Sequence, residues 1–150
     1  GIMEETCEAL LRAWMAMGAY IRGNRLLQDL SMNEMLVCNV LAGRAPNQPP
    51  VTATELCQRT QLLKSQINRI LTSMEDRGLI ERTRSPEDRR VVCIRLREEA
   101  LPRYQREHAH VLTVLEAVRS ALGEEDTRQL TALIQRATAA VTQYEQQRRS

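Results

Sequence analysis

The spacing of apolar residues changes from a helical to an alternating pattern at Gly78. Before it, residues 64–77 carry apolar side chains three and four apart, and Gly78 stands where a left-handed helix end favours glycine. After it, residues 79–84 and 90–96 alternate and are rich in β-branched types, with turn-forming residues 85–88 between them. The pattern predicts a helix followed directly by a β-hairpin.

A shorter helix is predicted just before this one. Thr52 and Glu55 have the spacing of a capping box, and the helix they begin ends near Thr60. Residues 61–63 then make a tight connection to the helix over 64–77. Two helices joined by a short turn are the helix-turn-helix pattern, and a hairpin directly after it makes a winged helix.

Long amphipathic helices are predicted on both sides of this core. The flanking elements are a helix over roughly 4–28, a helix from the capping box Ser31–Glu34 to about Ala42, a loop over 43–50, a helix over 98–122 and a last helix from Glu124 with a polar tail that frays from Gln146. The expected fold is mainly α, with a single domain over 1–150 and a winged helix-turn-helix core over 31–97.

The positive charge is concentrated in the predicted core. The net charge is only +2, yet residues 44–97 carry eleven basic and six acidic side chains, whereas both flanks are mildly acidic. Such a basic island predicts contact with a polyanion. Nearly all the basic residues are arginines, which suit contacts to phosphates and base edges, although a GC-rich genome would give the same bias.

The helix over 64–77 has one apolar and one polar face. At 100° per residue, its apolar residues share the side of Ile67, and the polar residues take the other side and its edges. These outward residues are Ser65, Gln66, Asn68, Arg69, Thr72, Ser73 and Asp76. Several can hydrogen-bond base edges. A solvated surface would hold the same residue types, but the preceding helix, the basic island and the hairpin favour DNA.

The hairpin turn is rich in arginine. Arg82, Arg84, Arg89 and Arg90 crowd it, and arginine at such a tip can enter a narrow minor groove. Asp88 is unfavourable near DNA as a free carboxylate, so we expect it to brace the turn by holding an arginine. The alternative is an exposed turn with weak surface ion pairs.

Residues 52–97 resemble the DNA-binding core of the MarR family of bacterial winged helix-turn-helix transcriptional regulators. The resemblance is carried by Leu56, by residues 63–71, by Glu75–Arg82 and by Pro86–Val92 with Ile94-Arg95-Leu96, and Asp88-Arg89-Arg90 matches the family's D-x-R wing signature. With the flanking helices it covers about 5–145. Two departures are Leu63, where the family has a capping Ser, and residues 96–100, which lack the family's Thr.

The resemblance implies a homodimer in which residues 1–28 and 98–150 interleave as dimerisation helices. Two recognition helices would then enter successive major grooves of a palindromic operator. It also implies a small-molecule effector near the junction of the dimer helices and the winged core. Candidates for an adaptable apolar pocket there are Trp14, Met15, Met17 and Met35, although such residues are more often ordinary core. The same apolar stripes could instead close one monomeric core.

The expected protein is therefore a cytoplasmic, homodimeric, effector-responsive transcriptional regulator of the MarR type that acts as a repressor on double-stranded DNA. We expect phosphate contacts from Lys64, Arg82 and Arg84, base contacts from Ser65, Gln66, Asn68 and Arg69, and a minor-groove contact from Arg90. By resemblance, Asp88 would orient the wing, and Arg89 belongs to the same wing.

Other functions have weaker support in the sequence. Cys7 would suit redox sensing, with only Tyr20 nearby as a partner, and His108 and His110 point about 200° apart, so they cannot share one metal ion from that helix. No catalytic, phosphate-binding or dinucleotide motif occurs, so we expect no enzyme, cofactor or metal. A winged helix that binds protein instead of DNA would not need an arginine-rich wing.

Overall fold

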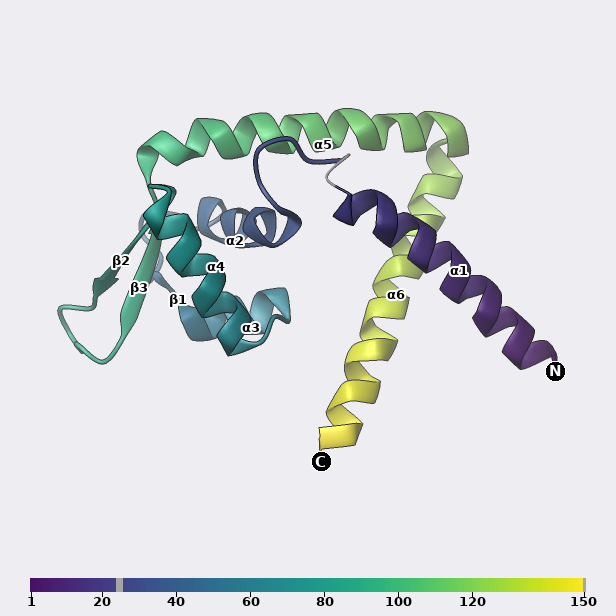
Figure 1. Cartoon of the computed structure of the whole chain (residues 1–150), viewed down its shortest axis with the longest axis horizontal. Helices are drawn as coiled ribbons and strands as arrows, with labels where there is room; N and C mark the ends of the chain where they lie inside the picture. Colours follow the sequence, from purple (N-terminus) through teal and green to yellow (C-terminus); the bar gives the residue numbers. More distant parts are fainter. Residues whose placement is uncertain (24–25, 150) are drawn as a thin grey trace. The chain divides into compact units, whose positions relative to one another are not determined.

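The computed structural model describes residues 1–23 and 26–149. In chain order the elements are α1 (Ile2–Arg22), α2 (Met32–Ala42), β1 (Val51–Thr52), α3 (Ala53–Thr60), α4 (Lys64–Asp76), β2 (Ile80–Arg84), β3 (Val92–Leu96), a 3₁₀ turn (Glu98–Ala100), α5 (Leu101–Leu122) and α6 (Glu124–Arg149) (Figure 1). The predicted mainly α, winged helix-turn-helix fold is confirmed. The chain divides into two compact units, residues 1–111 and 112–150.

The winged core lies in the first unit and is built on a small antiparallel sheet. The strand order is β1-β3-β2, with Val51 opposite Ile94 and Arg84 opposite Val92. Helices α2, α3 and α4 contact this sheet or one another, and the β2–β3 hairpin extends away from them (Figure 1). The buried side chains between these elements include Val37, Leu56, Ile67, Leu71, Met74, Leu79, Ile80 and Ile94.

Side chains one turn away begin helices α2 and α3. Ser31 Oγ accepts from the Glu34 amide at 3.1 Å and Glu34 Oε1 accepts from the Ser31 amide at 2.9 Å, so this predicted capping box is confirmed. The second predicted box is only half present. Thr52 Oγ1 accepts from the Glu55 amide at 3.2 Å, but the Glu55 carboxylate pairs with Arg44 and Arg59 instead of reaching back.

Two residues with positive φ set the ends of the helix-turn-helix. Gln61 (φ 62°) ends α3 in the left-handed region, and Gly78 (φ +74°) follows α4, as its position predicted. Leu63 supplies no side-chain cap to α4, but Gln66 Oε1 accepts from the Leu63 amide at 2.9 Å. Gln66, at the third helical position, thus accepts from the Leu63 amide, which the side chain of a capping serine at position 63 would not do.

Several predicted boundaries are wrong. The first helix ends at Arg22 instead of near residue 28; residues 26–30 are bends, and residues 24–25 of that prediction lie outside the described part of the chain. The return strand begins at Val92 instead of Arg90, because the Val91 amide donates to the Asp88 carbonyl and closes the turn. The two-residue strand β1 was missed. The last helix continues past Gln146 to Arg149.

The second unit contains the end of α5 and all of α6. Gly123 (φ +85°) separates the two helices. Arg119 pairs with Glu116 on its own helix and with Glu124 across this corner. Among the described residues, no helix is long and apolar enough to cross a membrane.

Candidate nucleic-acid interface

The recognition helix α4 presents the predicted polar face to solvent. Ile67, Leu71 and Met74 are fully buried against the core, which fixes the rotation of the helix about its axis. As a result Lys64, Ser65, Asn68 and Arg69 are exposed, and Gln66 is half-buried at the edge. The Gln66 side-chain oxygen already accepts from the Leu63 amide, so its NH₂ group and one remaining lone pair are left for other partners.

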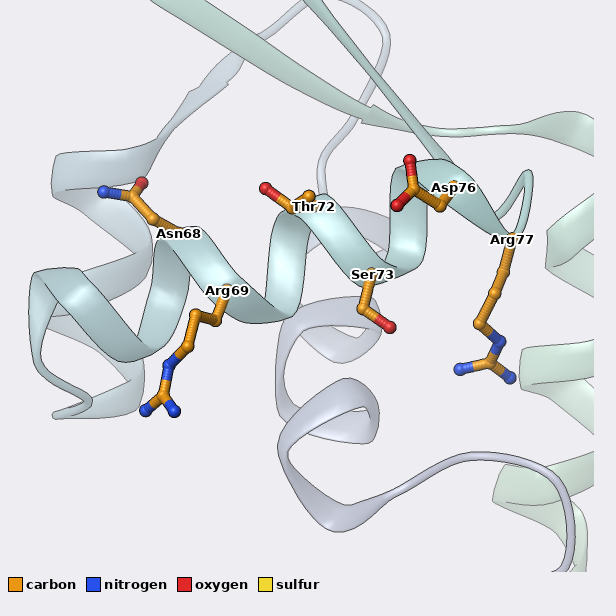
Figure 2. A pocket seen from close by; sticks show the side chains of 6 residues that line it. All are labelled: Asn68, Arg69, Thr72, Ser73, Asp76 and Arg77. Atoms are coloured by element: carbon orange, nitrogen blue, oxygen red, sulfur yellow. The ribbon is translucent and has the colours of Figure 1, made fainter.

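A shallow depression follows the outer face of α4. Its lining residues are Asn68, Arg69, Thr72, Ser73, Asp76 and Arg77. Figure 2 shows them in two rows along the helix, with Asn68, Thr72 and Asp76 in one row and Arg69, Ser73 and Arg77 in the other. The rows combine hydroxyl, amide, carboxylate and guanidinium groups, which can together contact donors and acceptors on base edges.

Asp88 holds Arg90 at the tip of the wing. Asp88 Oδ1 accepts from Arg90 Nε and Oδ2 accepts from Arg90 Nη2, both at 3.0 Å, while the Arg90 amide also donates to Oδ1 at 3.1 Å. The expected brace within the turn is therefore present. Hydrogen bonds from Arg90 keep the pKa of Asp88 below its usual range. The Arg90 side chain is nevertheless 91% exposed, so it is oriented without being buried.

A second arginine stabilises the wing from inside. Arg84 Nη1 donates to the carbonyl oxygen of Arg89 at 2.8 Å, and the Ser85 amide donates to the Val91 carbonyl. Arg89 itself is exposed beside the tip. The loop that carries Arg89 and Arg90 is thus fastened at its base and at its tip.

Arg82 lies between the wing and the recognition helix. Its guanidinium pairs with Glu75 at 2.8 Å and donates to Thr72 Oγ1 at 3.2 Å. Among the ten predicted DNA-contact residues it is therefore the one whose charge is already matched by a carboxylate on α4.

Sequence reasoning did not single out Arg77 as a site residue. It follows α4 directly, lines the depression and pairs with Glu34 of α2, while a weaker bond at 3.5 Å reaches the Asp29 carbonyl. Its partner Glu34 is 43 positions away, so no local pattern in the sequence could have signalled the pair.

The predicted effector-pocket residues have different surroundings. Met35 is half-buried against the core of the winged domain. Trp14, Met15 and Met17 are more than half exposed on α1. A single copy of the described chain therefore does not bury all four.

The predicted sensing residues also differ in exposure. Cys7 is exposed, whereas burial raises the pKa of the Cys38 thiol to about 12. The ring centroids of His108 and Tyr104 lie 5.8 Å apart, with the ring planes tilted by 37°. No group of three metal-ligating side chains is found within residues 1–23 and 26–149.

Comparison with known families agrees with this architecture. The sequence profile of the MarR family matches residues 28–91, which run from just before α2 through the helix-turn-helix to the tip of the wing. Residues 28–91 are thus similar to the MarR family. A search of curated proteins found no significant match.

Several solved structures share this fold. PcaV from Streptomyces coelicolor, in complex with its natural ligand, has 21% sequence identity and a TM-score of 0.74 over 87% of this chain and 91% of PcaV. MepR from S. aureus, in complex with DNA, has 17% identity and a TM-score of 0.74 over 89% and 96% of the two chains. BpsR from Bordetella bronchiseptica, whose DNA binding is regulated by 6-hydroxynicotinic acid, has 14% identity and a TM-score of 0.73 over 87% and 91%.

Proposed function

We propose that this protein is a homodimeric repressor of the MarR type that binds a palindromic operator and is released from it by a small-molecule effector. The observation that carries the proposal is the wing tip, where Asp88 holds an almost fully exposed Arg90 in a fixed direction. A guanidinium that already has one preferred direction loses little side-chain entropy when it enters an electronegative minor groove. Acting on DNA would place the protein in the cytoplasm.

The DNA contacts follow from exposure and chemistry. Ser65, Gln66, Asn68 and Arg69 on α4 would contact base edges, with Arg69 the natural partner of a guanine. Lys64 and Arg84 would contact phosphates, and Arg90 and Arg89 would contact the minor groove and its edges. Asp88 would serve by orienting Arg90. The sequence also assigns Arg82 to a phosphate, although its guanidinium pairs with Glu75.

Exposed apolar side chains support the homodimer. They include Leu10, Leu11, Trp14 and Met17 on α1, Leu112 and Leu115 on α5, and Leu130, Leu133, Ile134, Val141 and Tyr144 on α6. Monomeric proteins rarely expose so many large apolar residues along whole helix faces, whereas a second copy can cover them. Residues 1–28 and 98–150 would accordingly form the dimerisation region and residues 31–97 the DNA-binding core of one domain over 1–150.

The proposed effector is a small aromatic compound. PcaV is known with a natural ligand, and 6-hydroxynicotinic acid regulates BpsR, so two neighbours of this fold respond to or bind small molecules. Trp14, Met15 and Met17 are exposed in one copy and Met35 is only half-buried. These side chains would line an adaptable pocket once a partner subunit covers α1. The effector would act through its different affinities for the DNA-bound and free conformations.

Recovery of bound DNA from a randomised duplex pool tests the proposal. We expect an enriched palindrome with half-sites about one helical turn apart. The logarithm of the affinity should fall with the logarithm of salt concentration by about 0.9 per phosphate neutralised. No enrichment and no salt dependence would instead indicate a winged helix that binds protein. Enrichment only under reducing conditions would indicate that Cys7 senses oxidation.

A further inference from the structure

One carboxylate on the recognition helix holds both the main chain and the side chain of Arg82. Glu75 Oε2 accepts from the Arg82 amide at 3.2 Å, and Glu75 Oε1 accepts from Arg82 Nη2 at 2.8 Å and Nε at 3.3 Å. The Arg82 side chain is 26% exposed and that of Glu75 is 38% exposed. Glu75 therefore attaches the first strand of the wing, β2, to the outer part of α4.

The same arginine reaches Thr72. Arg82 Nη2 donates to Thr72 Oγ1 at 3.2 Å. A guanidinium has no acceptor, so the threonine oxygen must accept in this bond and its own proton must point elsewhere. Within the described chain, no hydrogen bond donated by this hydroxyl is found. Thr72 is exposed and lies in the depression beside Asn68 (Figure 2), so its hydroxyl is available as a donor on the outer face.

The charge of Arg82 is already compensated. Hydrogen bonding by Arg82 keeps the pKa of Glu75 below its usual range, so the carboxylate is ionised wherever DNA binding would be measured. A neutral pair releases fewer counterions from a nearby phosphate than a free arginine does. This argues against the assignment of Arg82 to a phosphate that its sequence position suggests.

We propose that Arg82 and Glu75 are a positioning pair that holds the wing against the recognition helix and presents the Thr72 hydroxyl as a donor to a base edge. Its target would be an acceptor in the major groove, such as guanine O6 or N7, adenine N7 or thymine O4. The inference rests on the proposed DNA binding and adds one specificity-determining residue, Thr72, to it.

A double-mutant cycle with salt titration tests the pair. Arg82→Met and Glu75→Gln should each weaken operator binding, and the double variant should be no weaker than either. The salt slope of the double variant should equal that of the wild type, because two neutral side chains replace a neutral pair. Arg82→Lys keeps the charge but loses the two-pronged geometry, so it should behave like Arg82→Met. Arg106→Met removes an exposed arginine outside the proposed interface and is the matched control.

The phosphate alternative predicts the opposite pattern. Arg82→Met would lower the salt slope by about 0.9, Arg82→Lys would largely restore it, and Glu75→Gln would tighten binding by removing a negative charge. That pattern would overturn the positioning role while leaving the proposed function intact. A wild-type protein without sequence-specific DNA binding would overturn the proposed function and this assignment together.

Operator variants test the hydroxyl. Thr72→Val removes the donor at nearly constant shape, and we expect discrimination to fall about three- to tenfold at one base pair of each half-site, the value of one hydrogen bond. Arg82→Met should reduce discrimination at that same base pair, because it releases the hydroxyl. An equal loss of affinity on all operator variants, or losses at different base pairs for the two substitutions, would overturn the assignment.

Discussion

Arg90 lies almost entirely in solvent, yet its guanidinium is held at two nitrogens by Asp88, two positions earlier. Ion pairs this exposed contribute little to folding. Their effect is on direction, because an arginine with one preferred orientation loses less side-chain entropy on binding than a free one. The D-x-R spacing at the wing tip is therefore better understood as preparation for binding than as stabilisation of the fold.

We expect Arg90→Ala to weaken DNA binding, because one minor-groove contact is lost. The unfolding temperature and the oligomeric state should not change. The DNA affinity of Asp88→Asn should lie between that of Arg90→Ala and that of the wild type, since this substitution frees the guanidinium without removing it. Binding isotherms at several salt concentrations measure both effects, and unchanged Arg90→Ala affinity at physiological salt would contradict the role of the wing.

At the scale of elements, α5 fastens the segment that enters α2. Glu107 is 3% exposed, and its Oε1 accepts from the amides of Gln28 (2.9 Å), Asp29 (2.6 Å) and Leu30 (2.8 Å). Arg103, one turn earlier, pairs with Asp29 through two bonds of 2.9 Å. These contacts satisfy the backbone of residues 28–30 without helical bonds, which explains why the first helix does not extend to residue 28.

Glu107→Gln should lower the free energy of unfolding by about 1–3 kcal/mol, because a neutral amide is a weaker acceptor and turns a donor toward the same amides. Denaturant unfolding measures the loss. Glu98→Gln, at an exposed position before α5, is the matched control and should change stability by less than about 0.5 kcal/mol. Equal stability of the Glu107 variant and the wild type would mean that the three amides find water instead.

The Asp29–Arg103 pair gives stability a pH dependence of known sign. Hydrogen bonding by Arg103 lowers the pKa of Asp29 from its ordinary 3.8 in the folded state. A carboxyl with a depressed folded pKa stabilises the fold above its unfolded pKa, and that contribution is lost as the pH falls through the folded pKa. Asp29 is half-exposed, so the contribution is about 0–1 kcal/mol.

Urea unfolding at pH 6 and below pH 3 checks this pair. The wild type should lose more stability than Asp29→Asn between the two pH values, because only the wild type has this carboxyl to protonate. Arg103→Gln should reduce the pH dependence in the same way. A pH dependence identical in all three proteins would show that solvent screens the pair completely.

At the scale of the whole molecule, α1 and α6 have exposed apolar faces that a second copy would cover in the proposed dimer. Leu133 and Ile134 on α6 are 55% and 57% exposed in one chain. A charge placed there would be buried without a partner in the proposed dimer, at a cost of several kcal/mol. In a monomer the same charge would meet only water.

Leu133→Glu should therefore convert the protein from about twice 17.2 kDa to a single 17.2 kDa species in sedimentation equilibrium. The winged core should stay folded, since none of its buried residues is touched, and operator affinity should fall because one recognition helix binds alone. Gln129→Glu, an exposed polar position on the same helix, is the control. A wild type that sediments as a monomer would contradict the dimer directly.

Local patterns predicted much of the winged core. The Ser31 capping box, the glycine after α4 and the Asp88–Arg90 contact all join residues within three or four positions, where spacing alone brings side chains together. The rotation of α4 was predictable for the same reason, because a 3.6-residue period separates its buried and exposed faces. These features depend on neighbouring residues in the chain and not on the tertiary fold.

Contacts between distant parts of the chain were not predictable. Arg44 pairs with Glu55, which leaves half of a capping box unformed. Glu107 holds the amides of residues 28–30 from nearly eighty positions away, and β1 exists only because Val51 pairs with Ile94. The sequence suggests that Arg82 contacts a phosphate, but in the fold its guanidinium pairs with Glu75. The amino-acid sequence alone thus specified the helices, the wing and the polar face of α4, since these depend on short-range periodicity. Which charges are free and which are paired depended on packing, because opposite charges meet only after the chain has folded.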